Sequence, residues 1–264
     1  MIDMHCHILP GIDDGADELL TSTCMLKMAE EHGTKIIVAT PHLVEGGWGK
    51  SWKKINELCE ELNQKAKQEN IEIKIYPGAE VAMSMSMLEL FKEPGEYCLN
   101  NKQYMLVELP ATHVPIYADE FFFRLQAKGI KPILAHPERN SELIKNPTKI
   151  QNWVDKGILM QVNAPSLTGR MGERVKKTAE LLLNNGWVHI IGSDAHGLRA
   201  RRPILTEAEK IVTTILGAED SDILFRRNPL SIINGQDESC LEQIQPRKMS
   251  MNNGCWNIFK RMFS

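Results

Sequence analysis

The chain has 264 residues, 42% of them hydrophobic and 25% charged, a composition typical of folded globular proteins that excludes disorder for most of its length. The 31 Lys and Arg residues nearly balance the 34 Asp and Glu residues, and a formal net charge of -3 provides no general attraction to nucleic acid. The six cysteines form no C-x-x-C pair, so we expect reduced thiols and, with neither a signal peptide nor a transmembrane run in the sequence, a cytoplasmic protein.

Short runs rich in Ile and Val alternate with longer segments of helical periodicity, which is the pattern of parallel βα units. The predicted strands are 2–4, 35–40, 71–77, 104–109, 131–135, 158–162 and 187–191. A first helix is expected to be capped by Asp17, to end at Gly33 and to place Leu20, Cys24 and Met28 on one face. The other predicted helices are 52–69, 116–128, 150–156, 175–185 and 204–216.

Seven such units in 235 residues predict an α/β fold, a distorted (β/α)7 barrel one unit short of the TIM architecture, with a doubly wound open sheet as the alternative. We assign residues 1–235 to this barrel and 236–264 to a C-terminal tail. The tail is polar at first and then basic and aromatic. We interpret it as a packing or frayed terminus, and docking to a partner or a membrane surface is the alternative.

Ionisable side chains fall at the carboxyl ends of six of the seven predicted strands. They are His5 and His7 at the first strand, His42 after the second, Glu80 after the third, Glu108 at the fourth, His136 at the fifth, and Asp194 with His196 after the seventh. Barrel enzymes gather their active sites at this face, and residues two apart on a strand point the same way. A mixture of imidazole and carboxylate suits Mn, Zn or Fe, so the sequence predicts a multinuclear metal site.

Four further residues are interpreted differently from these candidate ligands. Asp13 and Asp14 form a turn after the first strand, and one of these carboxylates can reach a metal at the barrel mouth. Cys6 alternates away from the neighbouring histidines and is expected to pack in the core. His189 has the opposite parity to Asp194, so we expect it to face the helical shell.

Taken together, the motifs of the chain resemble a known family. They are His5-Cys6-His7, Asp13-Asp14-Gly15, Pro41-His42, Gly78-Ala79-Glu80, Glu108, His136-Pro137-Glu138-Arg139 and Ser193-Asp194-Ala195-His196. This ordered set resembles the PHP superfamily and, within it, the bacterial protein-tyrosine phosphatases of capsular and exopolysaccharide operons, the CpsB/CapC type. The resemblance covers residues 2–233 and implies a seven-stranded PHP-type barrel with three divalent metal ions, most often manganese.

The resemblance also implies roles for individual residues. One metal would be held by His5, His7, Glu80 and Asp194, a second by Glu80, Glu108 and His136, and a third by Asp14, His42 and His196. Arg139 and Arg201 would grip the phosphate through charge-assisted hydrogen bonds. Because Arg199 and Arg202 flank Arg201, the sequence leaves open which of these three reaches the phosphate.

The expected reaction is hydrolysis of phosphotyrosine by a metal-activated hydroxide that attacks phosphorus directly, since clustered divalent metals both activate water and neutralise phosphate oxygens. The resemblance implies a phosphotyrosine protein as partner, a bacterial tyrosine kinase located at the membrane that controls polysaccharide synthesis. A PHP phosphoesterase acting on histidinol phosphate or on nucleic acid ends, and a noncatalytic scaffold, are the alternatives. Cys255 and Arg261 match the C-x5-R spacing of cysteine-dependent phosphatases, but we interpret that match as accidental.

Overall fold

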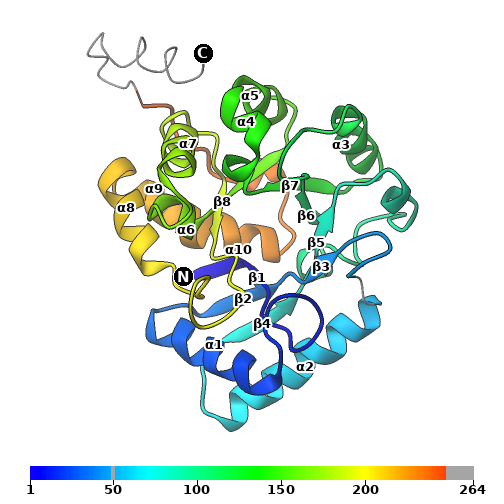
Figure 1. Ribbon diagram of the computed structural model, residues 1–264, viewed down its shortest axis with the longest axis vertical. Coiled ribbons are helices and arrows are strands. Elements are labelled where there is room, and N and C mark those ends of the chain that lie inside the picture. Colours follow the sequence, from blue (N-terminus) through cyan, green and yellow to red (C-terminus); the bar gives the residue numbers. More distant parts are fainter. Residues whose placement is uncertain (49–50, 248–264) are drawn as a thin grey trace.

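The structure is a computed structural model that describes residues 1–48 and 51–247, and its centre is a curled parallel β-sheet (Figure 1). Three strands form one sheet in the order β1 (Ile2–Cys6), β2 (Ile36–Ala39) and β4 (Lys74–Pro77). Six strands form the other in the order β3 (His42–Leu43), β5 (Glu80–Ala82), β6 (Tyr104–Glu108), β7 (Lys131–Ala135), β8 (Leu159–Asn163) and β9 (Ile190–Gly192). All pairs are parallel, and a bridge between Cys6 and Ala195 connects β1 to the segment after β9. The α/β class with a parallel, barrel-like sheet is therefore confirmed.

The described residues form nine strand segments, whereas the sequence predicts seven. The two additional segments, β3 and β5, are short and follow closely after β2 and β4. The chain leaves the three-stranded sheet at Pro41 and at Gly78 and then pairs again in the six-stranded sheet, where His42 lies opposite Glu80. Proline has no N–H to continue a ladder, which explains one of the two breaks.

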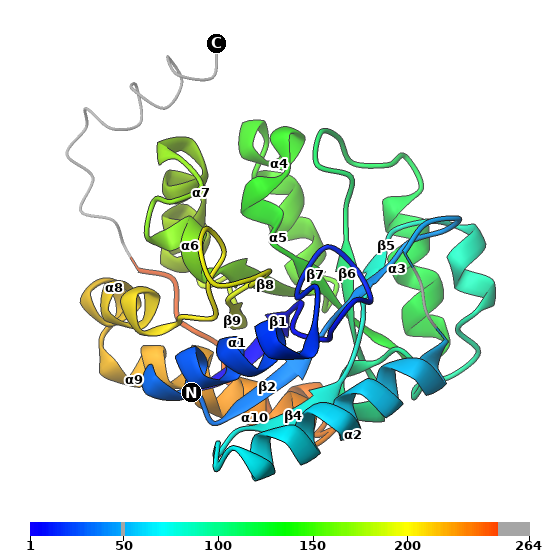
Figure 2. The same cartoon turned by 60° about the horizontal axis from the view of Figure 1, so that its bottom comes forward.

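The helices cover the outside of the curled sheet (Figure 2). The α-helices are α1 (Leu19–Glu31), α2 (Trp52–Gln68), α3 (Ala118–Ala127), α4 (Ser141–Lys145), α5 (Thr148–Val154), α6 (Ala164–Leu167), α7 (Glu173–Asn184), α8 (Thr206–Leu216), α9 (Ala218–Asp222) and α10 (Asn228–Ile233). Short 3-10 turns lie at η1 (Ser86–Glu89), η2 (Leu99–Asn101), η3 (Pro137–Arg139) and η5 (Glu238–Cys240), and a π-helical turn, η4, at Ile223–Arg227. All six helices predicted from periodicity are present within a few residues of their expected bounds. Within the described ranges, no helix is both long and apolar enough to cross a bilayer.

The sequence places Leu20, Cys24 and Met28 on one face of α1, but this is not the face that α1 buries. Leu20 is 66% exposed, and the residues that α1 buries are Ser22, Thr23, Met25, Leu26 and Ala29. The hydroxyls of Ser22 and Thr23 donate to the carbonyl oxygens of Glu18 and Leu19, so these two polar residues enter the core with their hydrogen bonds made. Asp17 does not cap the helix, because its carboxylate accepts a hydrogen bond from Thr21 instead.

Alternate residues of the strands point to the inside of the curled sheet. There, Val38, Leu106, Ile133, Leu159 and Ile190 form one buried apolar cluster. The ionisable residues follow this cluster toward the carboxyl ends of the strands. The inside of the sheet is therefore apolar at its centre and polar at the carboxyl ends of the strands, the arrangement expected of a barrel enzyme.

The described part of the predicted tail packs against the barrel. The hydroxyl of Tyr104 donates to the carbonyl oxygen of Gln236 over 2.9 Å, Ile244 is buried in the largest hydrophobic cluster, and Arg247 donates to the carbonyl oxygen of Ile215. Residues 248–264, with Cys255 and Arg261 among them, lie outside the described residues.

Candidate metal centre

Two histidines, one on β1 and one directly after it, begin the site. Nε2 of His5 and Nε2 of His7 lie 3.1 Å apart, and both side chains are fully buried. Oε2 of Glu80 lies 3.3 Å from the first nitrogen and 3.2 Å from the second, and Oδ1 of Asp194 lies 3.5 and 3.6 Å from the same two atoms. Four predicted ligands from β1, β5 and the segment after β9 thus direct their ligand atoms at one point.

Glu80 also faces a second group of side chains. Its Oε1 lies 2.8 Å from Nε2 of His136, which is 3.6 Å from Oε1 of Glu108. Nδ1 of His42 lies 3.1 Å from Oε2 of Glu80 and 3.7 Å from Oε2 of Glu108. Glu80 is therefore placed to bridge two cations, as the family resemblance implies.

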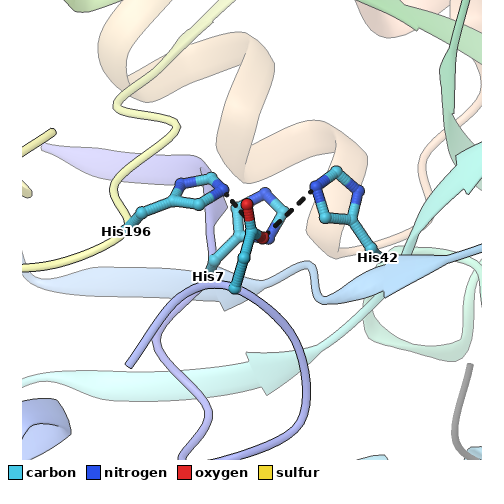
Figure 3. A group of neighbouring side chains, drawn as sticks. His7, His42 and His196 are labelled. Atoms are coloured by element: carbon cyan, nitrogen blue, oxygen red, sulfur yellow. Dashed lines mark ion pairs between the residues drawn. The ribbon is translucent and has the colours of Figure 1, made fainter. Parts of the chain in front are cut away.

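The third group surrounds the turn after β1. Figure 3 shows the imidazoles of His7, His42 and His196 converging. Oδ1 of Asp14 lies 3.5 Å from Nε2 of His42 and 3.3 Å from Nε2 of His196. The ligand atoms of His7, Asp14, His42 and His196 all lie within 4.8 Å of one another. His7 therefore adds to the three residues that the resemblance implies.

These residues fit a set of divalent cations. Three buried ligand atoms, Nδ1 of His42, Oε2 of Glu80 and Nε2 of His196, have no hydrogen-bond partner. Buried polar atoms in folded proteins nearly always have a partner, so atoms without one require an explanation. Since all three belong to the groups described above, cations bound by nitrogen and oxygen ligands would satisfy them.

The charge of the site also favours cations. Burial raises the pKa of Glu80, but the charge of His5 and the close approach of the His136, His5 and His7 imidazoles outweigh burial and hold the pKa well below its ordinary value. The pKa of Asp194 is also lowered, because His5 and His136 outweigh the effect of burial. Burial and the charge of Glu80 raise the pKa of Glu108 to about 7. Two carboxylates thus stay anionic, and a nearby positive charge would favour ionisation of the third.

Asp13 supports the ligands and does not join them. Its Oδ2 lies 2.8 Å from Nδ1 of His7 and accepts a hydrogen bond from the backbone N–H of His42, while its Oδ1 accepts from the backbone N–H of Gly15. Burial lowers the pKa of His7, but the hydrogen bonds and charges of Asp13 and Glu80 outweigh burial and raise it to about 10. The carboxylate that reaches the metal groups is that of Asp14, and Asp13 orients two of the histidines.

Two arginines reach the site. Nη1 of Arg139 lies 2.6 Å from Oδ2 of Asp194. Nε of Arg201 donates to the carbonyl oxygen of Asp194, and its Nη2 pairs with the carboxylate. Arg202 instead faces Glu207 at 3.9 Å, and Arg199 is exposed. Of the three neighbouring arginines, Arg201 is therefore the one that turns into the site.

An amide pair that the sequence did not single out links two of the ligands. Oε1 of Gln161 lies 2.9 Å from Nδ1 of His5, and Nε2 of Gln161 donates to Oδ1 of Asn163. Nδ2 of Asn163 in turn donates to Oδ2 of Asp194 over 2.6 Å. Both amides are fully buried. Because they carry no charge, the pattern of ionisable residues does not include them, although Asn163 directly follows the sixth predicted strand.

Two candidate ligands have unusual backbone conformations. His136 has φ 31° and Asp194 has φ 51°, values in the left-handed region that residues other than glycine rarely adopt. Each lies just beyond the carboxyl end of a strand, where the chain turns its side chain toward the mouth. Strain of this kind is concentrated at functional sites.

Comparisons with known proteins identify the family of the chain. Residues 1–234 match the family model described as capsular polysaccharide synthesis, CpsB/CapC. The chain is 35% identical over 219 residues to the tyrosine-protein phosphatase YwqE of Bacillus subtilis, covering 83% of this chain and 86% of that protein. It is 30% identical over 241 residues to the tyrosine-protein phosphatase CpsB of Streptococcus pneumoniae, covering 89% and 99% of the two chains.

A solved structure is similar over nearly the whole chain. It is described as one of the crystal structures of YwqE from Bacillus subtilis and CpsB from Streptococcus pneumoniae, unique metal-dependent tyrosine phosphatases. Its TM-score is 0.86 at 32% identity, and the match covers 95% of this chain and all of the other. The match of the family model and the identity to both relatives show that the chain belongs to the CpsB/CapC family of capsular polysaccharide synthesis.

Proposed function

We propose that this protein is a metal-dependent protein-tyrosine phosphatase. The observation that carries the proposal is the convergence of seven imidazoles and carboxylates in three groups, with His136 and Asp194 in contact with those groups and two arginines beside them. The ligands are His5, His7, Asp14, His42, Glu80, Glu108, His136, Asp194 and His196. The activity named for the relatives, including the metal-dependent phosphatase of similar structure, supports the same reaction.

The chemistry follows from the charges in the site. Three divalent cations, most favourably Mn²⁺, would neutralise phosphoryl oxygens and lower the pKa of bound water toward neutrality. Arg139 and Arg201 would turn from Asp194 to the phosphoryl oxygens, to which planar guanidinium groups donate in pairs. Hydroxide would form the new bond to phosphorus while the bond to the tyrosine oxygen breaks, without a phosphoenzyme. The tyrosine side chain would leave as a phenolate and take its proton from solvent, and hydrogen phosphate would be released.

Removal of the metals and of one ligand tests the proposal. Treatment with EDTA should abolish hydrolysis of a phosphotyrosine peptide, and added Mn²⁺ should restore it. His136→Ala should lower kcat by more than about 100-fold, whereas His32→Ala, at the end of α1, should not change it. Undiminished turnover after EDTA or in His136→Ala would contradict the metal mechanism. Faster hydrolysis of histidinol phosphate than of the peptide would instead support the small-molecule alternative.

The physiological substrate we propose is a phosphorylated bacterial tyrosine kinase at the cytoplasmic membrane surface. The capsular polysaccharide family of the chain supports this partner. Dephosphorylation of the purified kinase, compared with the same kinase carrying phosphoserine alone, would test the pairing.

A further inference from the structure

Trp48 is an exposed aromatic residue at the rim of the candidate metal centre. Its ring stacks on the imidazole of His42, with the ring centroids 5.4 Å apart and the ring planes inclined by 12°. Trp48 nevertheless remains 47% exposed. A large apolar ring thus lies open to solvent next to a candidate metal ligand, and none of the roles described above uses it.

The loop that carries Trp48 is held in place by hydrogen bonds. The backbone N–H of Val44 donates to the carbonyl oxygen of Trp48 over 2.5 Å, and the N–H of Gly47 donates to the carbonyl oxygen of Val44 over 3.2 Å. Oε2 of Glu45 accepts a hydrogen bond of 2.7 Å from the hydroxyl of Ser84, which attaches the loop to the segment after β5. An aromatic ring positioned in advance loses little freedom when a ligand packs on it.

We propose that Trp48 is a specificity-determining residue that stacks against the phenyl ring of the phosphotyrosine substrate. This inference rests on the proposed function and names the residue that selects its substrate. In phosphotyrosine the ring is joined directly to the ester oxygen, so it lies immediately outside the groups that hold the phosphoryl group. His42 belongs to those groups, and Trp48 is the aromatic ring stacked upon it.

The contact would favour aryl over alkyl esters. Aromatic rings in contact stabilise one another beyond the area that they bury. Phosphoserine has no ring to place against Trp48, so its ester gains nothing from the indole. The metal groups and the arginines contact only the phosphoryl part, which the two substrates share. Trp48 therefore supplies a preference for phosphotyrosine that the metal centre alone does not.

Trp48→Ala tests the inference with two peptides of identical sequence, one carrying phosphotyrosine and the other phosphoserine. We expect kcat/KM for the phosphotyrosine peptide to fall about tenfold, which corresponds to about 1.4 kcal/mol, and that for the phosphoserine peptide to fall less than about twofold. Trp48→Phe should recover most of the preference. Phe123→Ala, which removes another exposed aromatic residue, on α3, should leave the ratio of the two values unchanged.

Two further measurements separate recognition from positioning. The inhibition constant of phenylphosphonate, relative to that of methylphosphonate, should rise about tenfold in Trp48→Ala while the bound manganese per chain stays the same. Equal losses with both peptides, or a loss of manganese, would show that Trp48 only supports His42 and would overturn the inference. A metal-loaded wild type that hydrolyses neither peptide would refute the proposed function instead.

Discussion

Asp13 shows how a side chain outside the candidate ligands can position them. It accepts a hydrogen bond from the backbone N–H of His42 on β3 and contacts the ring of His7 just after β1, so it orients two candidate ligands that are distant in sequence. The sequence placed both Asp13 and Asp14 near the metals. Their roles could not be distinguished there, because the backbone of the turn decides which of two adjacent carboxylates points inward.

Asp13→Asn should weaken metal binding while the ligands remain in place. The amide loses the negative charge that orients His7 and makes it more basic, and loss of such a partner typically costs 10- to 100-fold in metal affinity. Titration of the metal-free protein with Mn²⁺ by calorimetry measures the effect. Asp17→Asn is the matched control, because that exposed carboxylate pairs with Thr21 and lies outside the metal groups, so the affinity should be unchanged. An unchanged affinity in Asp13→Asn would refute the positioning role.

His189 should make the stability of the protein depend on pH. It is buried outside the three metal groups, its Nδ1 accepts a hydrogen bond from the backbone N–H of Met160, and burial lowers its pKa to about 4. Between pH 6.5 and 4 the unfolded chain binds a proton at this residue and the folded chain does not, so the free energy of unfolding falls as the pH falls. The contribution is at most about 1.4 kcal/mol per pH unit.

Urea unfolding of the wild type and of His189→Gln at several pH values between 4 and 7 measures this contribution. The variant should be less stable at pH 7, but its stability should fall less steeply toward pH 4. Parallel pH profiles would show that His189 does not titrate as the structure indicates.

At the scale of elements, the site depends on how closely β9 approaches β1. A Cβ atom added at Gly192 would lie 2.6 Å from the Cβ of His5 and 3.2 Å from its backbone nitrogen. Only glycine lets these strands come together so that His5 and Asp194 face the same point. The sequence gives no sign of this requirement, because Gly192 directly follows the predicted strand 187–191 and the clash exists only in three dimensions.

Gly192→Ala should therefore destabilise the fold by about 1–3 kcal/mol and lower the affinity for Mn²⁺, because either β9 or His5 must move. The urea midpoint and the metal titration measure the two effects. At Gly197 an added Cβ would meet nothing within 4 Å, so the same substitution there provides the control for stability. Equal unfolding midpoints for the two variants would contradict the close approach.

The strand ends could be predicted from the sequence, whereas the exact path of the chain could not. His5, Glu80 and His136 follow apolar runs that only parallel strands explain, so their shared position at one face followed from the βα pattern. The breaks at Pro41 and Gly78 do not interrupt that pattern, and the two additional strands were missed. The apolar pattern does not reveal the buried face of α1, because that face includes the polar residues Ser22 and Thr23. Their hydroxyls donate to backbone carbonyl oxygens one turn earlier, which allows burial.

At the scale of the whole molecule, the segment 236–247 packs against the barrel and contributes to its core. Ile244 is 3% exposed, the carbonyl oxygen of Gln236 accepts hydrogen bonds from Gln103 and Tyr104, and Asn228 donates to the carbonyl oxygen of Glu242. The segment contacts residues from β6 to α10, and so it connects parts of the barrel that are distant in sequence. A deletion that begins at Gln236 would therefore remove part of the core together with any docking segment.

A chain truncated after Gly235 should consequently unfold at a lower urea concentration than one truncated after Arg247. Loss of a buried isoleucine alone typically costs 2–5 kcal/mol, and the lost hydrogen bonds add to that value. Ile244→Ala in the full-length chain should reproduce much of the difference. Comparison of the full chain with the one ending at Arg247 then tests the docking alternative for residues 248–264, because a change in localisation at an equal urea midpoint would support docking. Equal midpoints for the two truncated chains would show that the segment adds nothing to the fold.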